Sequence, residues 1–313
     1  MYFLKPQSWI RWAGPMLLAL GLCTASLKAQ SSDANQGRSY LFTIKKANTP
    51  TSYLFGTIHL PDARVARVGQ DVQNAFNASD AVYTEIPMDP AVMATAATAM
   101  MLPPEDSLEN ILPSRTMKRF DEELKQINPA LDPTPFLQFK VWAAAATLML
   151  LETQLNNPGI KAMDMALYTI AEDRGKRVGA LETPEEQLAV FEAFSRQEQI
   201  ELFDSLLETM KELRESGTNY TDVLVDAYRT GDLDVLQELM VTYADENTKL
   251  QQKFERLLLD NRNFLMADRI SDEISKYPDE SIFFAVGAAH LYGTDGVINL
   301  LKRAGFSVER AYE

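Results

Sequence analysis

The sequence predicts an α/β fold, because short strand-like runs alternate with long helical stretches along the chain. Apolar runs of strand length occur at residues 39–46, 52–56, 79–87, 177–182, 281–287 and 306–312. Helical periodicity dominates residues 91–156 and 184–276, and we expect these two stretches to form a large helical insertion. This alternation of strands and helices is the pattern of α/β proteins.

The first two runs predict an antiparallel hairpin. Ser39–Lys46 and Ser52–Gly56 are separated by a short turn that contains Asn48 and Pro50. The second strand leads into His59, and a proline–aspartate pair then ends it. We therefore expect the His59 side chain to project from the end of a strand.

The third run, Ser79–Pro87, carries a carboxylate near its end. Glu85 follows Val, Tyr and Thr residues that favour a strand. Such a carboxylate is rarely buried unless it is paired or bound to a metal, so Glu85 is a candidate site residue. The alternative is an edge position where Glu85 faces water, which Pro87 would permit.

Two helices are predicted in the middle of the chain. Phe136–Leu151 is apolar on most sides, and Gln138 and Lys140 interrupt it, so it predicts a core helix rather than a membrane span. Ile160–Ala171 predicts a second helix, which carries Asp164 on or beside its apolar face.

A capping box marks the boundary between the strand at 177–182 and the next helix. Thr183 is the cap, Pro184 takes the first helical position and Glu186 the third. Glu182 is therefore expected at the carboxyl end of a strand, where α/β proteins bind ligands.

Arg262 and Asn263 interrupt an otherwise apolar helical pattern near residue 260. Their side chains are suited to bind a carboxylate or a carbonyl oxygen. The alternative is a surface arginine paired to a nearby acid.

The two histidines of the chain follow one pattern. His59 and His290 each stand three residues after a glycine at the end of an apolar run, in Gly-Thr-Ile-His and Gly-Ala-Ala-His. Neutral imidazole is the commonest metal ligand and the usual general base at neutral pH. If their strands are adjacent and parallel, about 5 Å apart, the two imidazoles could share one small ion.

Glu85, with Glu182 as a second candidate, would complete a His/His/carboxylate set. Such a set suits Zn²⁺, Mn²⁺, Co²⁺ or Fe²⁺ and leaves positions open for water. A metal-bound water could then attack an amide or ester, and the carboxylate that is not a ligand would act as general base. Arg262 and Asn263 would orient the substrate or stabilise an oxyanion. The alternative is that both histidines end their strands without a ligand.

The composition excludes some partners. A formal charge of −14 over 313 residues argues against nucleic acid and against anionic membrane surfaces. Residues 1–29 predict a signal peptide, with Lys5 and Arg11 before an apolar run and cleavage expected after Ala29 or Ala25. The alternative is an uncleaved N-terminal anchor, which would be the chain's sole membrane contact.

Cleavage after Ala29 would remove the positive charges of Lys5, Arg11 and Lys28, so the formal charge would change from −14 to −17. It would also remove Cys23, the only cysteine, and leave no disulfide or thiol chemistry. These features fit a periplasmic or secreted protein of the bacterial envelope.

Several motifs together resemble the TraB/GumN family, which is similar to the animal Tiki proteins. They are Phe55-Gly-Thr-Ile-His59-Leu-Pro-Asp62, Tyr83-Thr-Glu85, Leu181-Glu-Thr-Pro-Glu-Glu-Gln187, Arg262-Asn263 and Val286-Gly-Ala-Ala-His290-Leu-Tyr-Gly-Thr-Asp-Gly-Val297. The resemblance covers nearly all of residues 39–312. It implies one domain over residues 38–313, with an EreA/ChaN-like (erythromycin-esterase/ChaN-like) fold in which helices flank a central mixed sheet.

The resemblance also implies an activity. Tiki members act as peptidases that use Mn²⁺ or Co²⁺, and their two histidines and one glutamate correspond here to His59, His290 and Glu85, with Arg262 and Asn263 as auxiliaries. We therefore expect an exported metal-dependent hydrolase acting on a peptide or another small substrate. Because ChaN-like proteins bind haem without hydrolysis, a non-catalytic binder of a peptide or haem is the alternative. A structural protein with incidental histidines is a third hypothesis.

Overall fold

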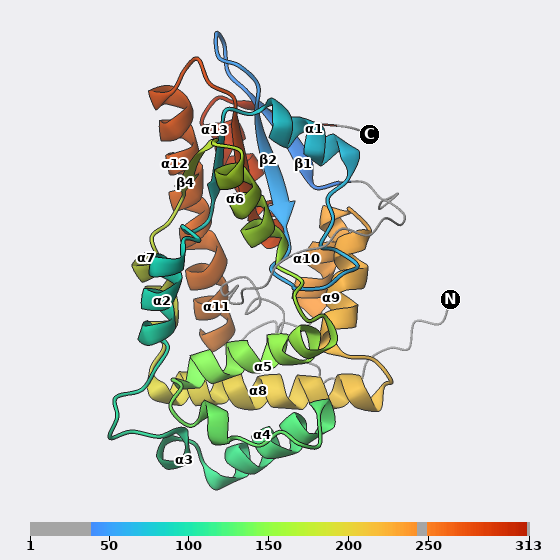
Figure 1. The fold of residues 1–313 in the computed structure, drawn as a ribbon, viewed down its shortest axis with the longest axis vertical. Helices are drawn as coiled ribbons and strands as arrows, with labels where there is room; N and C mark the ends of the chain where they lie inside the picture. The colour runs from blue at the N-terminus through green and yellow to red at the C-terminus, as the bar shows by residue number, and fades with distance from the viewer. Residues whose placement is uncertain (1–38, 243–248, 312–313) are drawn as a thin grey trace.

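The fold is built on a six-stranded mixed sheet, so the predicted α/β class is confirmed (Figure 1). The computed structural model describes residues 39–242 and 249–311, so the predicted signal peptide lies outside the described residues. The strands are β1 Leu41–Lys45, β2 Ser52–Thr57, β3 Ala81–Thr84, β4 Arg177–Ala180, β5 Ile282–Gly287 and β6 Ser307–Arg310. Their order in the sheet is β4-β3-β5-β2-β1-β6.

The sheet has a parallel part and an antiparallel part. β4, β3, β5 and β2 run parallel to one another, whereas β1 is antiparallel to both β2 and β6. The predicted hairpin of the first two strands is therefore confirmed. Because four parallel strands end at one edge of the sheet, the residues that follow them are brought together there.

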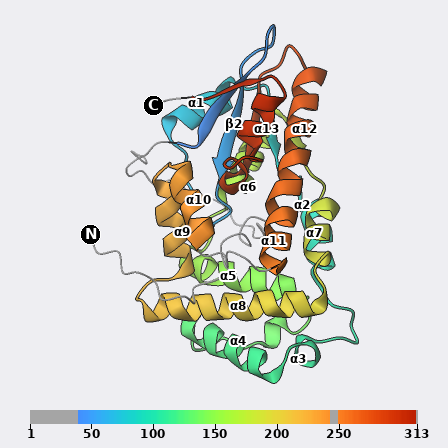
Figure 2. The ribbon, with the colours of Figure 1, turned by 180° about the vertical axis from the view of Figure 1, so that it is seen from behind.

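Thirteen α-helices lie within the described residues. They are α1 Gln70–Ala78, α2 Pro90–Ala99, α3 Leu108–Ile111, α4 Ser114–Ile127, α5 Val141–Asn156, α6 Met163–Asp173, α7 Pro184–Glu192, α8 Arg196–Glu215, α9 Tyr220–Arg229, α10 Leu233–Thr242, α11 Lys249–Glu255, α12 Asn261–Lys276 and α13 Val297–Arg303. In Figures 1 and 2, α4, α5 and α8 lie across one end of the molecule, and the β2 arrow points toward this helical layer. The carboxyl edge of the parallel strands thus faces the helices of the insertion.

Burial on both faces explains the composition of the central strand. Every residue of β5 is buried, and Phe283 packs against Phe55 and Phe76 at ring-centroid distances of 5.9 and 5.6 Å. A continuous apolar run is expected of a parallel strand that is covered on both faces. The capping boxes at Thr183 and Ser195 fix the start of α7 and α8, and the first of them was predicted.

Two helix predictions need correction. The predicted core helix from Phe136 starts only at Val141, because Phe136 ends a 3₁₀ turn and Phe139 pairs with Met101 in a short bridge. Residues 262 and 263 do not interrupt a helix. They lie in the first turn of α12, directly after a π-helical turn at Arg256–Asp260. A π turn contains one extra residue and so changes the direction of the side chains after it.

None of the helices in residues 39–242 and 249–311 combines the length and apolar character needed to cross a membrane.

Candidate active site

Both histidines lie just beyond the ends of adjacent parallel strands. In the pairing of β2 with β5, Gly56 is opposite Val286 and Thr57 is opposite Gly287. His59 follows β2, and His290 ends a short 3₁₀ turn after β5. The two segments touch at Gly56, where an added Cβ would lie 3.1 Å from the Cα of Ala288. The glycine of the first motif is therefore a point of close approach between the two motifs.

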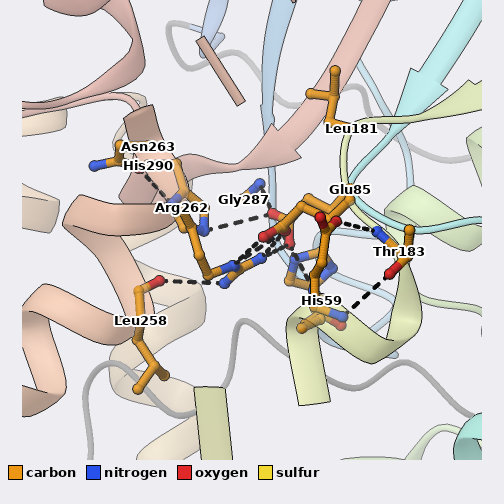
Figure 3. A network of polar contacts seen from close by, with 12 residues as sticks. His59, Glu85, Leu181, Thr183, Leu258, Arg262, Asn263, Gly287 and His290 are labelled. Atoms are coloured by element: carbon orange, nitrogen blue, oxygen red, sulfur yellow. Dashed lines mark hydrogen bonds and ion pairs between the residues drawn. The ribbon is translucent and has the colours of Figure 1, made fainter. Parts of the chain in front are cut away.

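The two imidazoles converge on one carboxylate (Figure 3). Nε2 of His59 lies 3.5 Å from Oε1 of Glu85, and Nε2 of His290 lies 3.8 Å from the same oxygen. All three side chains are buried, and neither Nε2 atom has a hydrogen-bond partner among the residues that the structure describes. The structure thus brings together the three residues that the sequence nominated as metal ligands. Glu85 does not face water at a sheet edge, so that alternative is wrong.

The other ring nitrogen of each histidine has a different partner. Nδ1 of His59 lies 2.9 Å from Oδ2 of Asp164 on α6, whereas Nδ1 of His290 lies 2.6 Å from Oδ1 of Asn263 on α12. An acceptor at Nδ1 holds the proton there and orients the ring. In its neutral form, each ring therefore presents the lone pair of Nε2 toward Glu85.

These partners give the two histidines opposite charge preferences. Burial lowers the pKa of His59, but Asp164 and Glu85 outweigh that effect and raise it to about 10. Burial and the nearby positive charge of Arg262 lower the pKa of His290 to about 3. At neutral pH and without a metal, His59 is therefore protonated and His290 is neutral.

Arg262 joins the two nominated carboxylates. It lies between Glu85 and Glu182, with Nη2 at 2.6 Å from Oε2 of each, and it is itself buried. Burial alone would raise the pKa of Glu85, but Arg262 and His59 hold it well below its usual range. For Glu182 burial prevails over Arg262, and its pKa is raised. The alternative of a surface arginine is therefore wrong.

A family model matches almost the whole described chain. The model, described as the TraB/PrgY/gumN family, covers residues 40–310. The chain belongs to the TraB/PrgY/gumN family. The resemblance predicted from the sequence motifs is thereby confirmed.

Relatives of this TraB/PrgY/gumN chain include proteins named as metalloproteases. It is 29% identical to "Metalloprotease TIKI1" of Xenopus tropicalis over 92% of the chain and 66% of the relative. The human protein of the same name is also 29% identical, over 94% and 65% of the two chains. "Metalloprotease TIKI homolog" of Nematostella vectensis is 27% identical over 87% and 66%.

The chain thus spans just under two thirds of the length of these relatives. No solved structure matches it significantly.

Two residues that contact the candidate site were not nominated from the sequence. Asp164 was noted on the apolar face of its helix but was not nominated, and the structure places it against His59 with an exposed fraction of 2%. The signal was present, because a carboxylate on an apolar helix face needs a partner. Gln187, which donates to Oε2 of Glu85 at 3.2 Å, gave no such signal.

The donor set fits a small divalent cation in its chemistry. Two buried imidazole nitrogens without partners and one carboxylate oxygen are a combination that Zn²⁺, Mn²⁺, Co²⁺ and Fe²⁺ accept. No three His, Cys, Asp or Glu side chains in the described part of the chain form a compact ligand group. Oε1 of Glu85 also accepts from the backbone N–H of Gly287 at 2.6 Å. The chemistry of these donors, and not their spacing, identifies His59, His290 and Glu85 as the residues that would hold a metal.

Proposed function

We propose that this protein is a metal-dependent hydrolase, with peptides as its substrates. The observation that carries the proposal is the pair of buried, unpartnered Nε2 atoms that converge on Oε1 of Glu85. The printed names of its relatives, which call them metalloproteases, support the same reading. A bound divalent metal would acidify a water and polarise the peptide carbonyl.

The protein's own residues would prepare this chemistry. Asp164 and Asn263 orient the imidazoles of His59 and His290, and the N–H of Gly287 orients Glu85. In this proposal Glu182 accepts the proton of the attacking water, because a raised pKa suits a carboxylate to proton transfer.

Arg262 and Asn263 have different roles here from those predicted. Arg262 is bound to Glu85, to Glu182 and to the carbonyl of Leu258, so we assign it to holding the carboxylates rather than to contacting an oxyanion. Asn263 uses its carbonyl oxygen on His290 and keeps its amide nitrogen for another partner.

The test combines metal content with peptide cleavage. Purified protein is loaded separately with Mn²⁺, Co²⁺, Zn²⁺ and Fe²⁺, analysed for bound metal, and incubated with a peptide library with and without a chelator. We expect about one ion per chain, chelator-sensitive cleavage with Mn²⁺ or Co²⁺, and loss of both properties in His59→Ala, His290→Ala and Glu85→Gln.

Glu201→Gln changes an exposed glutamate of α8 and is the matched control, which should keep both properties. An intact library at full metal occupancy would reject the hydrolase. Stoichiometric uptake of a peptide or of haem without turnover would then support the non-catalytic binder.

We further propose that the chain is exported to the bacterial periplasm, on the composition of residues 1–29. N-terminal sequencing of protein from the envelope fraction tests this. A start at Gln30 or Ser26 supports cleavage, and Met1 in the envelope fraction supports an anchor.

A further inference from the structure

A pocket of about 260 Å³ lies beside the candidate site, at Asn263. Its walls come from the π turn, from the start of α12 and from the loop that follows His290. Asn263 therefore contacts both features, because its carbonyl oxygen faces His290 and its residue lines the pocket. The volume is below the range of about 300–1,000 Å³ that small-molecule pockets occupy, and it suits a single side chain.

The charge of the pocket is negative. Glu255, Asp260 and Asp295 line it, and the described residues contribute no Lys, Arg or His to its wall. Glu255 accepts a hydrogen bond from Gln251, and Asp295 is paired with the exposed Arg303. The side chain of Asp260 has neither a hydrogen bond nor an ion pair within the described residues. One carboxylate is thus left without a counter-charge at the wall of a cavity.

The Asn263 side chain points independently to a ligand. It is 3% exposed, and its Oδ1 is used on His290, but its Nδ2 donates to no described residue. In Figure 3 the amide nitrogen of Asn263 is turned away from the histidine. Among the described residues, this amide nitrogen is thus left to donate to a carbonyl oxygen of a group bound in the pocket.

We propose that this pocket binds a positively charged group of a peptide, with Asp260 as its counter-charge and Asn263 as the donor to a neighbouring peptide carbonyl. The inference rests on the proposed function, since it assigns a substrate preference to that site. Peptides with an ammonium or guanidinium group near the cleaved bond are then the preferred class. The cation is either a basic side chain or the free N-terminus of the peptide.

The electrostatics of the pocket agree with this assignment. Burial, together with the like charges of Asp295 and Glu255, raises the pKa of Asp260. A cation seated among the three carboxylates would offset this repulsion.

The test compares peptides that differ by one charge. Hexapeptides carry either Lys or neutral norleucine at each position in turn, with a free or an acetylated N-terminus. Binding to the full chain, in metal-loaded and chelated forms, is measured by fluorescence anisotropy, and cleavage is measured by mass spectrometry. Asp260→Asn is compared with Asp268→Asn, which removes an exposed carboxylate from α12, the helix that follows Asp260, outside the pocket.

We expect the wild-type protein and Asp268→Asn to bind the charged peptide roughly tenfold more tightly than its neutral partner, and less so at high salt. Asp260→Asn should reduce this preference to less than about threefold. Loss of the preference on acetylation identifies the N-terminus as the cation, and loss with norleucine identifies a side chain. Equal preference in the two variants, or no preference in wild type, overturns the inference.

The two proposals can fail separately. If no peptide is cleaved with any metal but the preference depends on Asp260, the hydrolase is rejected and the pocket assignment is supported. If peptides are cleaved without regard to charge, the hydrolase is supported and the pocket assignment is overturned.

Discussion

The two halves of the site share a motif and differ in its surroundings. His59 and His290 each follow a glycine at the end of parallel, neighbouring strands, and both present Nε2 to the same oxygen of Glu85. However, Nδ1 of His59 contacts the carboxylate of Asp164, whereas Nδ1 of His290 contacts the amide oxygen of Asn263. The motif thus determines where an imidazole lies. Its surroundings determine its charge: Asp164 and Glu85 raise the pKa of His59, whereas burial and Arg262 lower that of His290.

Arg262 reinforces this difference. Its positive charge lowers the pKa of His290, and it does not figure among the causes of the raised pKa of His59. It also neutralises the two carboxylates, of which Glu85 is shared by both histidines. Burial and the Arg262 cation therefore keep His290 neutral, whereas the carboxylates of Asp164 and Glu85 keep His59 protonated.

The largest effect is expected from removing that cation. Arg262→Met would leave Glu85 and Glu182 buried without a counter-charge, and we expect it to lower the free energy of unfolding by about 3–5 kcal/mol in urea denaturation. Arg303→Met is the control, because it breaks an exposed pair with Asp295 and should cost about 1 kcal/mol or less. Similar losses in the two variants would show that the buried arginine does not hold the carboxylates.

The second prediction separates the two histidines by pH in chelated protein. The pKa of His59 is raised from 6.5 to about 10, so its stabilising contribution is complete below pH 6.5 and is lost as the pH rises through about 10. The pKa of His290 is lowered to about 3, so its contribution is complete above pH 6.5 and is lost as the pH falls toward 3. Between the unfolded and folded pKa values of a group, each pH unit changes the free energy of unfolding by about 1.4 kcal/mol.

The test is urea denaturation of two variants, which gives the free energy of unfolding at each pH from 3 to 10. His59→Gln should flatten the alkaline decline, and His290→Gln should flatten part of the acid decline, which Glu85 shares because its pKa is lowered. If both variants changed the stability on the same side of the pH profile, the claim that the two histidines have oppositely shifted pKa values would be disproved.

Much of the fold could be predicted because its signals are local. Apolar runs identified the strands, and the Thr183–Glu186 capping box fixed the start of α7. The convergence of His59 with His290 also followed from sequence, since both end strands and one sheet can align them. Strand ends were less certain, and Glu85 and Glu182 lie just beyond β3 and β4 rather than within them.

The parts that could not be predicted depend on contacts between distant segments. The interaction of Asp164 with His59 requires the packing of α6 against the strand ends, which no local pattern specifies. The side-chain directions of Arg262 and Asn263 depend on the π turn before them, and the sequence suggested only a break in the helix. Thus the sequence identified the ligand candidates and also Arg262 and Asn263, but it did not predict the contacts of these two residues or nominate Asp164.

The third prediction concerns a variant in which His59, like His290, has an amide rather than a carboxylate beside its Nδ1. Asp164→Asn keeps an acceptor for Nδ1 of His59 but removes the charge that raises its pKa. Loss of a partner behind a metal-bound histidine typically weakens metal affinity about 10–100-fold, and we expect this range in titration calorimetry. Asp173→Asn, which changes an exposed residue at the end of the same helix, should leave the affinity unchanged. An unchanged affinity in Asp164→Asn would mean that Asp164 does not support the ligand.

The smallest effect concerns the contact between the motifs. In Gly56→Ala the new Cβ would lie 2.7 Å from Cδ1 of Leu291, 2.9 Å from Cβ of Tyr40 and 3.1 Å from the Cα of Ala288. The leucine methyl can shift but the backbone cannot, so we expect a loss of about 1 kcal/mol in the free energy of unfolding, at the low end for overpacking. Gly69→Ala is the control, because its Cβ would be close only to the mobile end of the Asp71 side chain. Equal stability of the two variants would show that the segments bearing His59 and His290 are not tightly packed.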